Sequence, residues 1–357
     1  MAMTDFAVAV DDARDRGGPA QPLLTVNGLK KHFPIKGGIL GRTVAHVRAV
    51  DGISFTVRKG ETLGIVGESG CGKSTVARLL MRLIRPDSGE QIFDGDPVGA
   101  PRGITVAEMR RQVQMVFQDS SSSLNPRMPV QNSIAFGPMA FGEKQADAIA
   151  MARELLVKVG LNPALFGGRY PHELSGGQKQ RINIARALAM KPRMVILDEA
   201  VSALDKSVEA QVLNLLQTLK RDLNLTYIFI SHDLGVVRWI SDRVMVMYLG
   251  EVVEIGPADE IYRNPKHPYT RALLDSKPAM DPDHRREEAP VSGDPPNPIN
   301  PPSGCRFHTR CPFAEAVCSA KSPAIGMVEP HMHVAACHMQ DLSSGHTKAG
   351  MVLEGTH

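Results

Sequence analysis

The stretch LGIVGESGCGKSTVARLL, residues 63–80, decides the fold of this 357-residue chain. An apolar run of strand length leads into a glycine-rich loop, and an amphipathic helical pattern follows. The loop fits G-x-x-x-x-G-K-[ST], in which glycines let successive backbone N–H groups turn towards phosphate oxygens at a helix N-terminus. The spacing therefore predicts a phosphate-binding loop of nine residues: Gly67, Glu68, Ser69, Gly70, Cys71, Gly72, Lys73, Ser74 and Thr75.

Two side chains of this loop have expected roles in nucleotide binding. Lys73 has the reach to contact the β and γ phosphates, and the Ser74 hydroxyl suits a Mg²⁺ ligand. The alternative is a glycine-rich turn that matches by chance. The strand before the loop and the helix after it favour the phosphate loop.

Further apolar runs of strand length alternate with helical stretches along the chain, at 114–117, 194–197, 227–230 and 244–248. Buried strands interleaved with helices predict an α/β core with a largely parallel sheet. A crossover helix is expected over 207–223, because five apolar residues fall on one helical face. These are Val208, Val212, Leu215, Leu216 and Leu219.

The chain divides by composition into four parts. Residues 1–22 are expected to be a disordered leader, because the N-terminus lacks the basic flank and apolar core of a signal peptide. Residues 23–262 form the expected α/β domain with the phosphate-binding loop, and a helical subdomain is inserted at about 119–180. Residues 263–340 contain a Pro- and Gly-rich linker from about 277 and then a small cysteine-rich module. Residues 341–357 are expected to be a flexible tail.

Bulk composition excludes some function classes. Charged residues are 22% and hydrophobic residues 43% of the chain, which is ordinary for a globular protein. A formal net charge of +3 gives no electrostatic argument for nucleic-acid binding. No run approaches the length of apolar sequence that crosses a bilayer, so we expect that the chain does not span the membrane by itself. Because the N-terminus lacks the features of a signal peptide, we expect a cytoplasmic protein.

Polar residues follow three of the predicted strands. Asp198 and Glu199 end the run at 194–197, where Asp198 suits the Mg²⁺ shell and Glu199 suits the general base of hydrolysis. His232 follows the run at 227–230, where an imidazole can contact a γ-phosphate oxygen or orient the base. Gln118 ends another strand and offers an amide oxygen to metal or water. A solvated loop is the alternative for the Asp–Glu pair, and a structural role is the alternative for His232.

A second helix start also has the features of a phosphate site. In LSGGQ, Ser175 and Gln178 have the spacing of a capping box. Gly176 and Gly177 leave the first backbone N–H groups bare. One nucleotide cannot easily use both helix starts of the same chain, so the pattern predicts a dimer in which this helix covers the partner's γ-phosphate. A plain helix cap is the alternative.

Taken together, GESGCGKST, Gln118, LSGGQ, VILDE, SALD and His232 resemble the nucleotide-binding subunit of an ATP-binding cassette (ABC) transporter, over about residues 23–340. The resemblance implies a P-loop NTPase fold of the ABC type and two subunits that sandwich two ATP molecules. It further implies that Phe33 stacks on adenine and that Asp205 lies in the loop crossing the dimer interface. Gln118 would couple the ATP site to the helical subdomain, which contacts the membrane permease. Two positions depart from the branch considered next: Ala200, where proline is usual, and Lys206, where an apolar residue is usual.

The branch is indicated by residues 36–57, by SLNPRM at 123–128 and by NPKHPYTRALL at 264–274. These resemble the second ATPase of oligopeptide and dipeptide importers, which implies peptide import. The implied partners are a related ATPase, two permeases and an extracytoplasmic binding protein, at the cytoplasmic face of the inner membrane. A homodimer is the alternative to the heterodimer. Nickel and glutathione importers share these signatures and are the alternative solute classes. Two alternatives to a transport ATPase are a soluble ABC ATPase that acts on DNA or ribosomes and a nucleotide-dependent regulatory module with little turnover.

Four of the five cysteines lie near the C-terminus: Cys305, Cys311, Cys318 and Cys337. Four thiolates suit tetrahedral zinc or a four-iron cluster, and four unrelated thiols are the remaining alternative. The resemblance to the peptide-importer branch implies a 4Fe-4S cluster. For zinc, His308, His331, His333 and His338 are close in sequence. Cys71 occupies a variable position of the phosphate loop, where a packing role is expected.

Overall fold

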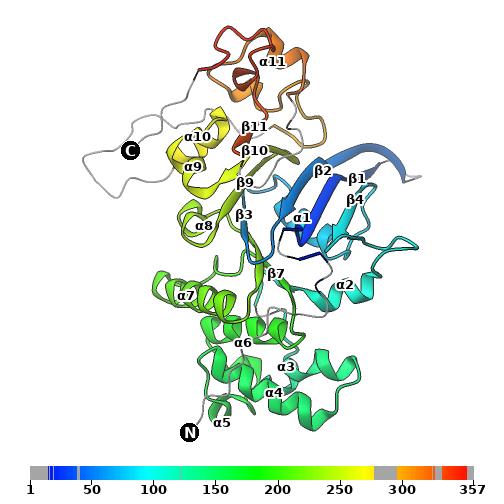
Figure 1. The fold of residues 1–357 in the computed structure, drawn as a ribbon, viewed down its shortest axis with the longest axis vertical. Coiled ribbons are helices and arrows are strands. Elements are labelled where there is room, and N and C mark those ends of the chain that lie inside the picture. Colours follow the sequence, from blue (N-terminus) through cyan, green and yellow to red (C-terminus); the bar gives the residue numbers. More distant parts are fainter. Residues whose placement is uncertain are drawn as a thin grey trace. The chain divides into compact units, whose positions relative to one another are not determined.

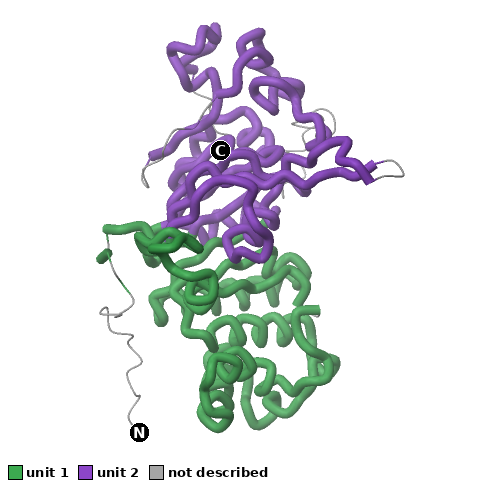
Figure 2. Tube along the Cα trace, turned by 90° about the vertical axis from the view of Figure 1, so that its right-hand side faces the viewer, with its two compact units in different colours: residues 1–23, 58–62, 93–231 green, residues 24–57, 63–92, 232–357 purple. Residues whose placement is uncertain are grey.

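The computed structural model describes residues 15, 17–18, 20–37, 41–120, 122–276, 296–323, 325 and 332–351. The chain forms two compact units, which Figure 2 colours separately. Unit 1 comprises residues 1–23, 58–62 and 93–231, and unit 2 comprises residues 24–57, 63–92 and 232–357. The linker expected after residue 276 lies outside the described residues as far as 295, and so does most of the expected leader.

Unit 1 contains three parallel strands in the order β8-β7-β6. They are β6 (Val113–Val116), β7 (Met194–Asp198) and β8 (Thr226–Ile230). Val113 pairs with Met194, and Met194 pairs with Thr226. Every residue of β7 and β8 is buried, which explains why their sequences are continuous apolar runs rather than alternating ones.

The helices of unit 1 follow the expected alternation with strands. They are α2 (Val106–Gln112), α3 (Val130–Ala140), α4 (Gln145–Lys158), α5 (Pro163–Phe166), α6 (Gly176–Leu188) and α7 (Lys206–Asp222), with a 3₁₀ turn η1 (Pro171–Glu173) and the short strand β5 (Asp96–Pro97). Helices α3, α4 and α6 pack against one another, and α3, α4 and α5 gather at one end of this unit (Figure 1). Helices α3, α4 and α5 and the first residues of α6 lie within residues 119–180.

Helix α7 is the expected crossover helix, but its buried face differs slightly from the prediction. Val212, Leu216 and Leu219 are buried as expected, whereas Val208 and Leu215 are only half-buried. Glu209 and Leu213 are buried as well. The apolar pattern correctly predicts which side of the helix is buried. The buried face is nevertheless rotated slightly about the helix axis relative to the predicted face, because neighbouring elements decide which residues they cover.

Unit 2 begins with a long antiparallel hairpin of β1 (Leu24–Gly37) and β2 (Arg42–Val57). Its pairing runs from Leu24 opposite Val57 to Gly37 opposite Arg42. The next strand, β4 (Ser88–Phe93), lies beside β1 in the order β2-β1-β4. The hairpin reaches well past the shorter β4 (Figure 1).

A second group of strands in unit 2 has the order β11-β10-β9-β3. They are β3 (Thr62–Val66), β9 (Arg243–Tyr248), β10 (Glu251–Pro257) and β11 (Val334–Ala335). Strand β3 runs parallel to β9, and the β9–β10 and β10–β11 pairs are antiparallel. Outside the cysteine-rich module, the described helices of this unit are α1 (Lys73–Leu80), α8 (Leu234–Ile240), α9 (Ala258–Arg263) and α10 (Pro268–Asp275).

The cysteine-rich module of unit 2 consists of short elements: η3 (His308–Arg310), α11 (Ala316–Ala320) and η4 (His338–Gln340). The Cys305 amide donates to the Cys318 carbonyl at 2.7 Å. Residues 341–351, expected as part of a flexible tail, form hydrogen-bonded turns: the Gly350 amide donates to the Met339 carbonyl at 2.8 Å, and His346 is buried. The hydrogen-bonded module therefore extends to residue 351.

None of the helices in the described part of the chain is long and apolar enough to cross a membrane.

Candidate functional site

The phosphate loop lies between β3 and α1 in unit 2, as the sequence predicts. Gly72 is the N-cap of α1, and its φ of 111° lies in the left-handed region. A Cβ at this position would lie 2.1 Å from the Ala49 carbonyl oxygen. Glycine is required here for both reasons, because it tolerates the positive φ and the close backbone approach.

Lys73 is buried at the centre of this loop. Its Nζ donates to the carbonyl oxygens of Gly67 at 2.7 Å and of Glu68 at 3.0 Å. Cys71 is buried beside it, with Sγ 3.8 Å from Nζ, in line with a packing role. The loop is therefore closed around a fixed positive charge at the start of a helix, which is the arrangement that attracts phosphate.

The outer side of the loop is held by residues far along the chain. The Glu68 amide donates to the Tyr269 hydroxyl at 2.9 Å. Arg310 donates to both oxygens of the Glu68 carboxylate, from Nη1 at 3.0 Å and from Nη2 at 3.1 Å. Sequence reasoning missed both contacts. Nothing in the local pattern connects Arg310 with a loop 242 positions earlier.

Unit 2 also places the expected adenine-stacking residue and the expected histidine. Phe33 lies on β1 opposite Val47 with 37% of its surface exposed, and Lys31 Nζ is 5.6 Å from the ring centre. An exposed aromatic ring suits stacking on a base. His232 is exposed at the start of α8, which Asp233 caps by accepting from the Gly235 amide at 2.8 Å.

Unit 1 brings Gln118 and Glu199 together. Gln118 Nε2 donates to Glu199 Oε2 at 2.9 Å. Glu199 has a φ of 49°, which is uncommon for a residue with a side chain, and its amide is fixed by the Ile230 carbonyl at 2.9 Å. Strained backbone of this kind concentrates at functional sites. Asp198, immediately before it, ends β7 and is buried.

The second glycine-rich helix start has the capping box that the sequence predicts. The Gln178 amide donates to Ser175 Oγ at 3.4 Å, and the Ser175 amide donates to Gln178 Oε1 at 3.0 Å. Ser175 and Gly176 are exposed. A Cβ at Gly177 would lie 2.5 Å from Val208 Cγ1, so this glycine also permits close packing on α7.

The remaining predicted positions of unit 1 lie next to these elements. Asp205 is exposed at the N-cap of α7. The two departures from the family pattern have different surroundings: Ala200 is buried, and Lys206 Nζ pairs with Glu209 Oε1 at 3.0 Å. Neither residue replaces a reacting group.

The predicted site residues therefore fall into two sets. Unit 2 contains the phosphate loop with Phe33 and His232, and unit 1 contains Gln118, Asp198, Glu199, Ser175–Gln178 and Asp205. Direct contacts join Gln118 to Glu199 in unit 1 and the loop to the C-terminal module in unit 2.

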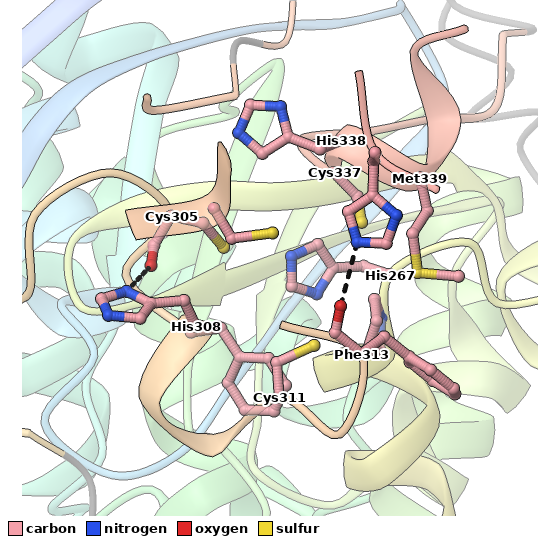
Figure 3. A pocket seen from close by; sticks show the side chains of 12 residues that line it. His267, Cys305, His308, Cys311, Phe313, Cys337, His338 and Met339 are labelled. Carbon is pink, nitrogen blue, oxygen red and sulfur yellow. Dashed lines mark hydrogen bonds between the residues drawn. The ribbon is translucent and has the colours of Figure 1, made fainter. Parts of the chain in front are cut away.

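The four C-terminal cysteines line one cavity of unit 2 (Figure 3). Cys305, Cys311 and Cys337 direct their sulfur atoms into it, and Cys318 completes the set. The cavity is small. The volume open to the centre of a water-sized sphere is about 10 Å³, so the cavity has room for little more than one water molecule. The other lining residues are His267, Pro268, Phe307, His308, Phe313, His338, Met339 and His346. Of the histidines expected near the cysteines, His308 and His338 line the cavity, His333 pairs with Glu254 instead, and His331 lies outside the described residues.

The predicted metal centre is not supported by this geometry. Within the described residues, no group of three or more His, Cys, Asp or Glu side chains is placed to hold a metal ion. Burial raises the pKa of Cys305 to about 11 and that of Cys337 to about 12, and it also raises the pKa of Cys311. The 4Fe-4S and zinc assignments have no support beyond the shared cavity.

Comparison with known protein families gives two matches. Residues 50–202 match the family model described as ABC transporter. Residues 253–318 match the model described as oligopeptide/dipeptide transporter, C-terminal region. The second match begins in β10 and includes three of the four cysteines that line the cavity.

Similar proteins cover nearly the whole chain. A probable peptide ABC transporter ATP-binding protein of Sinorhizobium fredii, y4tS, is 50% identical over 326 residues, which are 89% of this chain and 90% of that protein. The oligopeptide transport ATP-binding protein AppF of Bacillus subtilis is 49% identical, covering 89% of this chain and 98% of that protein.

Solved structures show the same fold. The cbiO1 protein of Clostridium perfringens, part of an ABC transporter complex, has a TM-score of 0.57 at 28% identity, covering 68% of this chain and 90% of that one. A dimeric, post-hydrolysis ATP-binding cassette bound to ADP and Pi, MJ0796, has a TM-score of 0.56 at 25% identity, covering 66% of this chain and 98% of that one.

The loop, the strand-end carboxylates and these fold matches define a P-loop ATPase of the ATP-binding cassette class, which confirms the predicted α/β fold. More particularly, the chain belongs to the family of peptide and oligopeptide ABC transporter ATP-binding proteins.

Proposed function

We propose that this chain is the ATP-hydrolysing subunit of a bacterial ABC importer for di- and oligopeptides. The observation that carries the proposal is the combination, in one chain, of an ABC core with the C-terminal region described for oligopeptide and dipeptide transporters. Relatives near 50% identity are named for peptide or oligopeptide transport. Nickel or glutathione import would use the same ATPase machinery. An uptake assay that compares these solutes with peptides distinguishes the alternatives.

In the proposed reaction, the loop Gly67–Thr75 binds the triphosphate. Its backbone N–H groups and the start of α1 face the phosphate oxygens, and Lys73 exchanges its contacts with the loop carbonyls for phosphate oxygens. The ring of Phe33 stacks on adenine. His232 contacts the γ-phosphate or orients the base.

The attacking water gives its proton to Glu199 as its oxygen bonds to the γ-phosphorus, and the bond from that phosphorus to the ADP oxygen breaks. Gln118 orients the Glu199 carboxylate through the 2.9 Å hydrogen bond. The oxygen donors of Ser74, Gln118 and Asp198 are of the type that Mg²⁺ prefers. When bound, Mg²⁺ would neutralise charge on the β and γ phosphates.

A second ABC ATPase subunit completes each ATP site in this proposal. The exposed start of α6 at Ser175–Gln178 would cover the γ-phosphate held by the partner's phosphate loop, and Asp205 would lie at the interface. We expect a related but distinct ATPase as partner, with a homodimer as the alternative. The helical subdomain would contact two membrane permeases that receive peptide from an extracytoplasmic binding protein, so that the chain is peripheral at the cytoplasmic face of the inner membrane.

For the cysteine module we propose a 4Fe-4S cluster held by Cys305, Cys311, Cys318 and Cys337. The support is the all-cysteine donor set on a single cavity. A cluster of this kind would cross-link a module too small to have a large core of its own. Anaerobic purification followed by iron, sulfide and zinc analysis tests it: four iron atoms per chain with visible absorption support the cluster, and zinc or no metal refutes it.

The transport proposal is tested in proteoliposomes that contain the ATPases, the permeases and the binding protein. ATP-dependent uptake of labelled peptide is expected, and Lys73→Ala in this chain should abolish its nucleotide binding and the uptake that depends on it. Lys144→Ala, an exposed lysine before α4, is the control for nucleotide binding. Uptake of nickel or glutathione in place of peptides would refute the peptide assignment, and normal nucleotide affinity in Lys73→Ala would refute the ATP site.

A further inference from the structure

We infer that Arg310 of the cysteine-rich module is a positioning residue for the phosphate loop, and that it acts on nucleotide binding through Glu68. The inference rests on the proposed ATPase function, because it assumes that the loop binds a nucleotide triphosphate. It adds a role for the C-terminal module in the ATP site of its own chain. Every residue on which it depends belongs to unit 2.

The contact between Arg310 and Glu68 has the geometry of a strong pair. Both terminal nitrogens of the guanidinium donate to the two carboxylate oxygens, at 3.0 and 3.1 Å. Only 7% of the Arg310 side chain and 25% of the Glu68 side chain are exposed. A bidentate ion pair with little access to water fixes the distance and orientation of its two side chains better than a single exposed ion pair does.

A cluster of aromatic rings holds Arg310 in this position. Its Nη1 also donates to the Tyr248 hydroxyl at 3.3 Å, and its guanidinium lies 6.0 Å from the ring centre of Phe307. The rings of Tyr248, Tyr269 and Phe307 have centroids 4.6 to 5.4 Å apart, and all three are buried. Tyr269 accepts from the Glu68 amide, so backbone and side chain of Glu68 are held by the same cluster.

The charge of Glu68 explains why this restraint matters for nucleotide binding. A carboxylate in a phosphate-binding loop repels the negative triphosphate, and repulsion between like charges is strong where water is excluded. Arg310 neutralises the carboxylate and keeps it on the side of the loop that faces the module. Without Arg310, Glu68 would be free to turn and would carry an uncompensated negative charge beside the phosphates.

The cysteine-rich module has a second attachment that fixes where Arg310 lies. Arg306 pairs with Asp51 on β2 and with Glu251 at 3.0 Å, and it donates to the Leu249 carbonyl. Arg310 is the last residue of the 3₁₀ turn η3, and Arg306 lies two residues before that turn. The segment that holds both arginines begins and ends with a cysteine of the cavity. The fold of the module thus sets the position of the guanidinium that holds the loop.

The test compares four variants of the full chain: Arg310→Gln, Arg310→Lys, Glu68→Gln and the double variant. We expect Arg310→Gln to raise the Kd and KM for ATP about tenfold while kcat at saturating ATP changes less than about twofold, because a charge-assisted contact is lost. Arg310→Lys keeps the charge without the bidentate geometry, so we expect it to raise the Kd and KM for ATP about threefold. In the Glu68→Gln background, Arg310→Gln should cause no further loss.

Arg271→Gln is the matched control. Arg271 also pairs with a carboxylate of unit 2, at 3.8 Å from Asp275, and that pair lies within helix α10 rather than in the loop. Its Kd for ATP should equal that of the wild type. Melting temperatures of all variants would show whether a change in Kd reflects loss of folded protein.

Two results would overturn the inference: an unchanged Kd in Arg310→Gln, or an equal loss in the presence and absence of the Glu68 carboxylate. If Arg310→Gln does not fold, Arg310→Lys and its combination with Glu68→Gln decide the question in the same way. Lys73→Ala separates this inference from the ATPase proposal. Loss of ATP binding in Lys73→Ala together with normal binding in the Arg310 variants refutes only the role of Arg310, whereas normal binding in Lys73→Ala refutes the nucleotide site itself.

Discussion

The two glycine-rich helix starts of this chain are stabilised in different ways. At the start of α1, the loop encloses a buried Lys73 and is held from outside by Tyr269 and Arg310. At the start of α6, Ser175 is exposed and is held by a capping box with its neighbour Gln178. One start is fixed by distant parts of its unit, and the other is fixed by its own first turn.

The difference fits the proposed division of labour. A loop that binds the triphosphate benefits from a fixed backbone, because its N–H groups must point at phosphate oxygens before the ligand arrives. A helix start that completes the site of another subunit needs exposed donors and a stable local turn. The following predictions test this contrast, from the largest expected effect to the smallest.

Glu199→Gln should impair ATP hydrolysis without changing either of the two helix starts. Removing the carboxylate should lower ATP turnover at least about hundredfold while ATP binding is retained, because the general base is lost and the loop is untouched. Steady-state hydrolysis and equilibrium nucleotide binding measure the two effects. Glu143→Gln, an exposed residue before α4, should match the wild type. Turnover that stays near the wild-type value in Glu199→Gln would exclude this residue as the base.

Arg306→Gln should weaken the attachment of the cysteine-rich module, which contacts the phosphate loop before α1, to the rest of unit 2. Asp51 and Arg306 are both largely buried, with side chains 11% and 6% exposed, so removing one partner should cost about 3 kcal/mol of unfolding free energy. Denaturant unfolding measures it. A loss below about 0.5 kcal/mol would contradict the buried pair.

The same attachment should depend on pH. Burial acts to raise the pKa of Asp51, but hydrogen bonds from Arg306 and His32 hold that pKa below its ordinary value. Lys30, Arg48 and Glu251 also face this group. A lowered folded-state pKa contributes stability above about pH 4 that is lost as the pH falls through the folded value, so the difference between wild type and Arg306→Gln should shrink below about pH 4.

Ser175→Ala should affect the exposed helix start alone. The lost cap should cost about 1 kcal/mol of stability, and turnover should fall about tenfold with unchanged nucleotide binding by the loop. Thr105→Ala is the matched control, because Thr105 and Glu108 form a capping box at the start of α2. It should lose similar stability and keep full turnover. Equal turnover in the two variants would reduce Ser175 to a plain helix cap.

Much of the site could be predicted from short stretches of sequence. The loop, the capping box at Ser175 and the strand ending in Asp198 were predicted where the structure has them. Where a helix ends is less predictable: α1 ends at Leu80, although the apolar residues Met81, Leu83 and Ile84 follow in the sequence. Apolar spacing gives the side of a helix that is buried, but neighbouring elements decide where the helix stops and which residues lie at the edge of the buried stripe.

The cysteines show where sequence spacing reaches its limit. Four thiols do line one cavity, as a shared role requires. Their spacing could not tell a metal centre from packed thiols, because ligation depends on the distances between sulfur atoms and on their protonation. Cys318 is buried and the other three cysteines are half-buried, and within the described residues no set of side chains is placed to hold an ion.

The sequence by itself determined the features that consecutive residues build: the glycine-rich loop, the helix cap and the carboxylates at a strand end. Each depends on backbone geometry within a few positions, so residue types and spacing are enough to specify it. Only the tertiary structure decided that Arg310 holds Glu68 and that Arg306 holds Asp51, across 242 and 255 positions. Such pairs arise from the packing of whole elements, and many arginines and carboxylates in the chain would satisfy the same local pattern.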